Sequence, residues 1–141
     1  TNASKGTQYF WLSKDCYSFF PPLTIRNSRG DKATYSCVVD IDFKDLNKTE
    51  ECRVTFEAEN NLDFRLGTSP LRATNTASEG DLVAITRVSD KKYELRIFRN
   101  GTQSFRVFIP YAIHFIGHRG KKYGFMPNSI FFDRMQNVSG R

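Results

Sequence analysis

Seven consecutive residues, ENNLDFR, gather the side-chain types that read the edges of DNA bases. The amides of Asn60 and Asn61 can each make paired hydrogen bonds to adenine, and the guanidinium of Arg65 can do the same to guanine. The carboxylates of Glu59 and Asp63 can accept a hydrogen bond from the amino group of cytosine. The alternative is an ordinary hairpin, because an Asn-Asn pair tolerates the left-handed geometry of a tight turn. The stretch therefore predicts a polar hairpin tip, with nucleic-acid contact as one of two interpretations.

One short pattern could belong to a nuclease. Metal-dependent nucleases often combine an acidic residue with a (D/E)-x-K triplet on adjacent strands, and Asp42-Phe43-Lys44 fits the triplet. The acidic partner would have to be Asp31 or Asp15, and neither lies clearly on a predicted strand. Because 26% of the chain is charged, a three-residue match arises readily by chance. The pattern does not predict an active site.

Other residues with reactive side chains favour structural roles. His114 and His118 have the spacing of a zinc pair on a helix, but the glycine between them and the flanking aromatics predict a strand end and a loop. Cys16, Cys37 and Cys52 lie in or near predicted strands, where cysteine usually packs as a small hydrophobic residue. The sequence therefore predicts no catalytic residue, no metal ligand and no cofactor.

Length, hydrophobicity and charge limit the class of protein. The 141 residues are 39% hydrophobic and 14% aromatic, enough for one domain with a hydrophobic core. No apolar run approaches the roughly 18 residues that a membrane span needs. Lys and Arg number 21 against 15 acidic residues, giving a net charge of +6, which favours a polyanionic partner such as nucleic acid. The chain opens on Thr1 without a signal peptide, and we expect residues 1–141 to be a single domain excised from a longer protein.

A secreted β domain is a second interpretation of the whole chain. Glycosylation sequons begin at Asn2, Asn47, Asn100 and Asn137, more than chance predicts. Secretion would favour paired cysteines, whereas three cysteines without a CxxC motif suit a reducing compartment such as the cytoplasm. A test for free thiols separates the two interpretations.

Alternating apolar and polar residues predict an all-β barrel or sandwich of about seven strands. The segment 26–32 is expected to be a turn, and the Pro-Pro pair at 21–22 excludes regular structure there. The only place expected to hold a short helix is 68–80, with Ser69 as its cap and Pro70 at its first position. The tail after residue 110 is expected to add one strand and a covering segment. Strands are expected at 9–12, 34–43, 52–58, 62–67, 81–88 and 92–99, and the tight turn at 100–101 leads into the strand-like segment 104–110.

The order of these segments resembles the B3 DNA-binding domain, a seven-stranded open pseudobarrel with one or two short helices. That family shows a strand, an Asn-rich tip, a second strand ending near Gly, a short helix, and then Gly-Asp followed by a hydrophobic strand. Here Gly80-Asp81 and the strand from Leu82 fit the second half. RLGTSPL is similar to the bacterial branch, the B3-like recognition domains of restriction endonucleases of the EcoRII, BfiI and NgoAVII type. The likeness covers 34–99 well and the first 33 residues loosely.

The resemblance implies a barrel that grips the major groove of double-stranded DNA with two arms. The second arm would be the tip from Glu59 to Arg65. The family's Trp near the helix is absent. The sequence instead has Trp11 in the first strand, where we expect it to pack in the hydrophobic core rather than to contact DNA. The implied residues of the first arm are Ser13, Lys14, Asp15 and Tyr17, with phosphate or base contacts beside it from Arg26, Arg29 and Lys32.

The function implied by the resemblance is sequence-specific DNA recognition in the bacterial cytoplasm by a domain without its own active site. Cleavage would belong to a nuclease domain or subunit of the same restriction endonuclease, and no membrane is involved. A B3-type transcription-factor domain is the alternative within the family. Exposed aromatic residues such as Tyr17 or Tyr123 would instead favour single-stranded nucleic acid, because base stacking tolerates any sequence.

Overall fold

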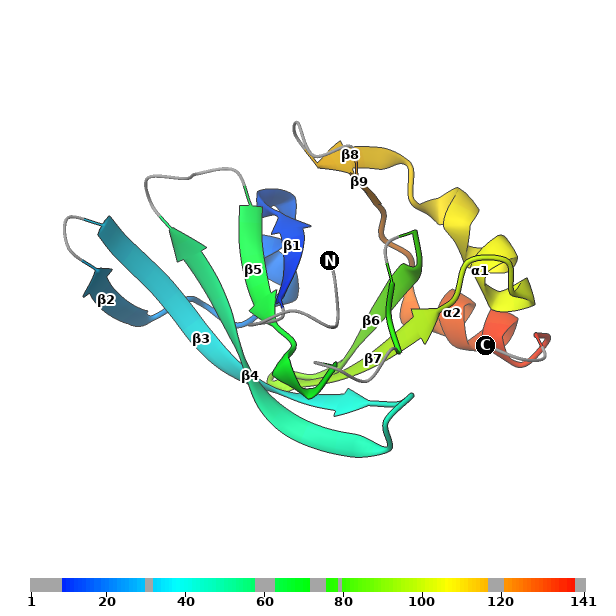
Figure 1. The fold of residues 1–141 in the computed structure, drawn as a ribbon, viewed down its shortest axis with the longest axis horizontal. Coiled ribbons are helices and arrows are strands. Elements are labelled where there is room, and N and C mark those ends of the chain that lie inside the picture. The colour runs from blue at the N-terminus through cyan, green and yellow to red at the C-terminus, as the bar shows by residue number, and fades with distance from the viewer. Residues whose placement is uncertain are drawn as a thin grey trace.

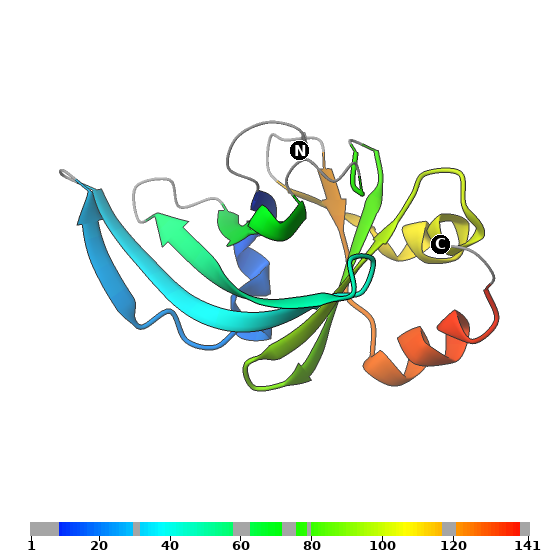
Figure 2. The ribbon, with the colours of Figure 1, turned by 60° about the horizontal axis from the view of Figure 1, so that its bottom comes forward.

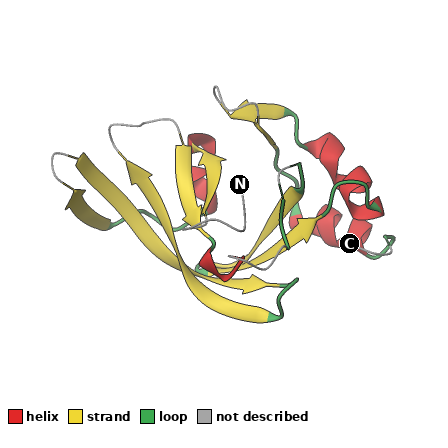
Figure 3. Cartoon of the chain, in the orientation of Figure 1, coloured by secondary structure: helices red, strands yellow, loops and turns green. Residues whose placement is uncertain are grey.

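The fold is that of a computed structural model, which describes residues 9–29, 32–57, 63–71, 76–78, 80–116 and 121–138. Strands dominate, and the helices are short (Figure 3). The strands are β1 (Tyr9–Ser13), β2 (Ile25–Arg29), β3 (Lys32–Phe43), β4 (Lys48–Glu57), β5 (Asp63–Gly67), β6 (Leu82–Ser89), β7 (Lys92–Phe98), β8 (His114–Ile116) and β9 (Lys121–Tyr123). The helices are η1 (Lys14–Phe19), η2 (Ser69–Leu71), α1 (Gln103–Phe108), η3 (Ile109–Tyr111) and α2 (Asn128–Met135).

Seven strands form one curled sheet (Figure 1), in which six follow the order β1-β5-β4-β3-β7-β6 and β2 pairs with β3 outside this order. The long strand β3 pairs with β4 along most of its length, and in addition β2 pairs antiparallel with its first part and β7 pairs parallel with its last part. The sheet curls without closing, so β1 and β6 remain as edges (Figure 2). The predicted seven-stranded open pseudobarrel is confirmed.

The inside of the curl is filled by the apolar residues of the alternating strands. On β3, Cys37, Val39, Ile41 and Phe43 are each at most 5% exposed, while the residues between them lie on the other face. We call this cluster the barrel core. Its other buried members are Cys16, Phe20, Cys52, Val54, Leu66, Leu71, Ala77, Tyr93, Leu95 and Ile97.

A second, aromatic cluster lies on the other face of β6 and β7. Phe98 from β7, Phe108 from α1 and Phe131 from α2 pack together, with ring centroids 4.9–6.4 Å apart. The guanidinium of Arg96 lies 5.6 Å from the rings of both Phe131 and Phe132. The helices α1 and α2 therefore cover a sheet face that the barrel core does not use.

Three sequence predictions about elements are wrong. Residues 25–29 form β2 rather than part of a turn. The segment after the tight turn at 100–101 is the helix α1, because the Thr102 hydroxyl accepts a hydrogen bond from the Phe105 backbone N–H and Phe108 packs into the aromatic cluster. The stretch 68–80 holds the short η2 among its described residues and is not the only helical region, since α2 follows near the end of the chain.

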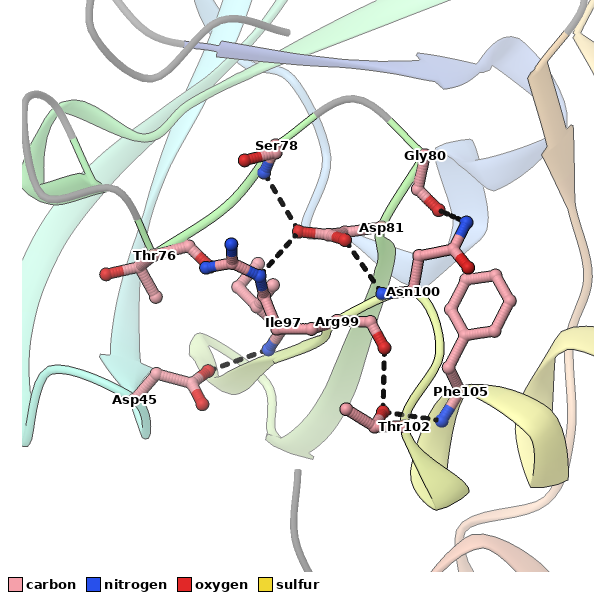
Figure 4. A network of polar contacts seen from close by, with 10 residues as sticks. All are labelled: Asp45, Thr76, Ser78, Gly80, Asp81, Ile97, Arg99, Asn100, Thr102 and Phe105. Atoms are coloured by element: carbon pink, nitrogen blue, oxygen red, sulfur yellow. Dashed lines mark hydrogen bonds and ion pairs between the residues drawn. The ribbon is translucent and has the colours of Figure 1, made fainter.

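Two carboxylates accept hydrogen bonds from backbone N–H groups in and beside β7 (Figure 4); the side chain of Asp81 is 6% exposed, whereas Asp45 is exposed. Asp81 accepts hydrogen bonds from the backbone N–H groups of Ser78 and Asn100, at 2.9 and 2.8 Å, and pairs with the Arg99 Nε at 3.3 Å. Asp45 accepts from the backbone N–H of Ile97 at 2.7 Å, at a point where β7 has left β3. These acids therefore serve as acceptors for backbone N–H groups in and beside the sheet.

The cysteines are unpaired and buried, against the pairing that the secreted interpretation requires. Burial raises the pKa of Cys52 to about 12 and raises the pKa of Cys37, so neither is a thiolate at neutral pH. One sequon side chain also has a structural partner, because the Asn100 amide donates to the Gly80 carbonyl at 3.2 Å. No helix among the described residues is long and apolar enough to cross a membrane.

Candidate nucleic-acid interface

The register of the sheet brings three turns to one end, which we call the arm end. β1 ends at Ser13 opposite Asp63, the first residue of β5. β4 ends at Glu57 opposite Thr34, close to the turn that joins β2 to β3. In Figure 1 these strand ends lie along the top of the curled sheet. The two arms implied by the sequence therefore leave the sheet side by side, although they are about fifty residues apart in the chain.

The first arm is a turn of 3-10 helix, η1, fixed on the barrel core. Phe19 and Phe20 pack edge to face at 5.3 Å, and both rings contact Tyr93. The Tyr93 hydroxyl donates a hydrogen bond to the Phe19 carbonyl. Tyr17 is 69% exposed. The arm thus presents Tyr17 from a rigid support.

Other predicted first-arm residues take different positions. Lys14 and Asp15 begin η1. Ser13 is only 7% exposed, so it positions the start of the arm rather than reaching outward. Trp11 lies in β1 as expected and is paired with Arg65 across the sheet; its side chain, expected in the core, is outside what the structure describes.

The second arm is described only at its base. Glu59, Asn60 and Asn61 lie outside the described residues. Asp63 begins β5, and Arg65 follows two residues later, partly exposed.

Arg65 belongs to a polar row across the outer face of the sheet. The register aligns Ser36 on β3, Thr55 on β4 and Arg65 on β5. Their neighbours Val54 and Leu66 point into the barrel core, so the row faces away from it. This outer face continues the surface of the second arm down the sheet.

Sequence reasoning missed Arg53, which lies on the same outer face. Arg53 is exposed, and its Nη1 donates to the Ser36 hydroxyl at 3.5 Å. It is a diagonal neighbour of Arg65, since Thr55 pairs directly with Arg65 and Arg53 is two residues along β4. The alternation in CRVTF could have identified Arg53, because it predicts that Arg53 and Thr55 lie on one face of the strand and Cys52 and Val54 on the other.

The remaining predicted cations do not all join this row. Arg26 is paired with Tyr35, and its guanidinium lies 6.0 Å from that ring. Tyr35 occupies the face of β3 that carries the barrel core, so Arg26 and Arg65 lie on opposite faces of the sheet. Arg29 and Lys32 are paired at the end of the β2–β3 hairpin, at the arm end.

The opposite end of the β3–β4 hairpin, which we call the far end, has neutralised cations. Lys44 pairs with Asp42 at 2.9 Å and with Glu94 at 3.2 Å, and these hydrogen bonds raise the pKa of Lys44. Lys48 pairs with Glu50 at 3.4 Å. Arg53, by contrast, bonds to a neutral hydroxyl and Arg26 to an aromatic ring. Among the described side chains, the lysines of the far end are therefore paired with carboxylates, whereas Arg53 and Arg26 have neutral partners.

The described residues hold no group of three or more His, Cys, Asp and Glu that could bind a metal ion. His114 lies in β8, where its ring stacks on Tyr123 at 5.3 Å. His118 is outside the described residues. Asp42, from the nuclease-like triplet, is in the ion pair with Lys44 described above.

Residues 1–138 match the family described as the DNA-binding domain of the metal-independent restriction enzyme BfiI. The chain belongs to this family. The match covers nearly the whole sequence, so the resemblance to the bacterial B3-like branch is confirmed. The comparison with curated proteins gave no match. The chain is a DNA-binding domain of a restriction-enzyme family, and its partner is DNA.

Proposed function

We propose that this domain recognises a specific sequence in double-stranded DNA, gripping the major groove between η1 and the β4–β5 tip. The observation that carries the proposal is the register of Ser13 with Asp63, which starts both arms at the same end of one rigid sheet. A two-stranded ribbon is narrow enough to enter the major groove. The arm residues proposed to face the bases are Tyr17, Glu59, Asn60, Asn61, Asp63 and Arg65.

Positioning on the backbone is proposed for other cations of the arm end. Protein groups that contact phosphates set the register of the duplex and carry no sequence information. Lys14, Arg29 and Lys32 lie at the base of the first arm and at the β2–β3 turn. Arg53 extends this set along the outer face. Arg26 would also contact the backbone, but it lies on the opposite face of the sheet, beside Tyr35.

The domain is proposed to leave cleavage to a nuclease domain or subunit of the same restriction enzyme, in the bacterial cytoplasm. The family match supports the restriction-enzyme setting over a transcription factor. The high pKa of Cys52 and the ion-paired state of Asp42 support the absence of an active site in this part of the chain.

The test is selection of bound duplexes from a randomised library at about 0.15 M salt, because the phosphate contribution alone changes affinity by orders of magnitude with salt. We expect enrichment of one short motif. Replacing Arg65 with Ala should then cost roughly 1–3 kcal/mol of discrimination at a single base pair. Binding without an enriched motif, or an Arg65→Ala loss that is the same on motif and scrambled duplexes, would contradict base reading by the second arm.

A further inference from the structure

The hairpin of β8 and β9 is separate from the main sheet and lies near the arm end. The two strands pair only with each other. In Figure 1 they lie at the top of the molecule, across the open side of the barrel from β1. Their six residues include Lys121 and Lys122 and no acidic residue.

The hairpin is held in a fixed position. Tyr123 packs against the barrel core, lies against the tilted His114 ring at 5.3 Å, and meets Phe125 edge to face at 5.8 Å. Gly124, the residue after β9, lies against the backbone of η3. A Cβ on Gly124 would be 1.7 Å from the Tyr111 carbonyl oxygen, so only glycine fits there. A basic element with this support can present a charge at a defined place on a duplex.

Lys122 lies beside the first arm. One cavity on the open side of the barrel is lined by Phe10, Leu12 and Phe19, from β1 and η1, and also by Lys122 and Tyr123 from β9. Lys122 is exposed. A duplex held by η1 therefore passes close to this lysine.

The width of the sheet places Lys122 beyond the bases that the arms can read. Four strand spacings of ~4.8 Å separate β2 from β1, so the arm end is at most about 19 Å wide. At ~3.4 Å per base pair this width corresponds to roughly six base pairs of DNA. The β8–β9 hairpin continues past β1, outside this span. Lysine is a compact point charge that binds phosphate without reading bases.

We propose that the β8–β9 hairpin is a third DNA contact, in which Lys122 binds a backbone phosphate on one flank of the recognition sequence. This rests on the proposed function. The contact adds affinity for duplexes longer than the recognition sequence and adds no sequence preference.

The test measures binding to the motif enriched by selection, placed in a long duplex and in two duplexes trimmed close to the motif on one side or the other. Lys122→Ala should weaken binding to the long duplex about three- to tenfold at 0.15 M salt, equally for motif and scrambled sequences, and make the slope of log K against log salt shallower by about 0.9. On one of the trimmed duplexes wild type and variant should bind alike. Lys122→Arg should restore binding. Lys48→Ala, an exposed lysine at the far end of β4, should leave it unchanged.

Three results would overturn the proposal: equal binding of Lys122→Ala and wild type to the long duplex, a loss that persists on both trimmed duplexes, or a loss confined to the motif. Thermal melting of the variants shows that each is folded. Failure of the proposed function is a separate result, since the wild-type protein would then enrich no motif. If only the Lys122 contact is wrong, the wild-type protein still enriches a motif, and Lys122→Ala binds the long duplex as tightly as wild type does.

Discussion

The arm end differs from the support region, which consists of the far end, β6, β7 and their loops, in the partners of its charged residues. In the support region, Asp81 and Asp45 accept backbone N–H groups, and Lys44 and Lys48 are paired with carboxylates. At the arm end, Arg53 bonds to a hydroxyl and Arg26 lies near an aromatic ring. The difference teaches that residue type alone does not mark a DNA-binding residue, because the partner decides whether its charge remains available to a phosphate.

The largest expected effect comes from breaking the support region at Asp81. Asp81→Ala leaves the backbone N–H groups of Ser78 and Asn100 without their acceptor, so the free energy of unfolding should fall by about 3 kcal/mol. The melting temperature, followed by circular dichroism, should fall by roughly 10 °C. The motif enriched by the folded variant should be that of the wild type.

The control for this variant is Asp133→Ala, since Asp133 is exposed on α2. A melting temperature for Asp81→Ala equal to that of Asp133→Ala would show that the network in Figure 4 does not stabilise the fold.

A smaller effect is expected where the first arm is joined to the barrel core. Tyr93→Phe removes the hydrogen bond to the Phe19 carbonyl and should cost about 1 kcal/mol at pH 7. Burial raises the pKa of Tyr93 from 10.0 to about 12, so the folded state favours the neutral phenol. Its contribution to stability is complete below pH 10 and is lost as the pH rises through 12. Urea unfolding at pH 8 and pH 11 should therefore show a smaller alkaline loss for Tyr93→Phe than for wild type.

The raised pKa of Cys52 acts in the same direction, from pH 9 upward, and is present in both proteins. The comparison therefore isolates Tyr93. An identical alkaline loss in the two proteins would mean that the phenol does not titrate with unfolding.

The smallest expected effect sharpens the comparison within a single strand. Arg53 and Lys48 are both exposed on β4, Arg53 in the middle of the strand and Lys48 at the far end. Arg53→Ala should weaken binding to all sequences about threefold at 0.15 M salt and make the salt slope shallower by about 0.9. Lys48→Ala should change neither quantity. Equal effects of the two variants in a titration series from 0.05 to 0.2 M salt would remove the distinction between the two ends.

Local patterns carried much of the prediction of the fold. The alternation from Thr34 to Phe43 and from Cys52 to Phe56 predicted two strands and their buried faces, because neighbouring side chains in a strand point to opposite sides. The helix α1 was not predicted, because its short sequence has no helical pattern of its own. The run from Phe105 to Phe108 is short and, apart from Arg106, apolar, and only the Thr102 cap and the packing of Phe108 on Phe98 decide that it is helical.

The candidate site was predictable in part. The residues of ENNLDFR and the first-arm segment could be proposed from their types and from the family resemblance. That both arms start at one end depends on the pairing of β1 with β5, which joins Ser13 to Asp63. That Arg53 accompanies Arg65 while Arg26 does not depends on which residues pair across β2, β3, β4 and β5.

The sequence by itself determined a mainly β domain, a basic surface and a polar tip with base-reading side chains, since these follow from composition and from a period of two residues. Only the tertiary structure decided the strand order, the meeting of the arms and the separation of available from neutralised charges. The physical reason is that pairing between distant strands is chosen by the burial of a common core, and that choice leaves no mark within any short stretch of the chain.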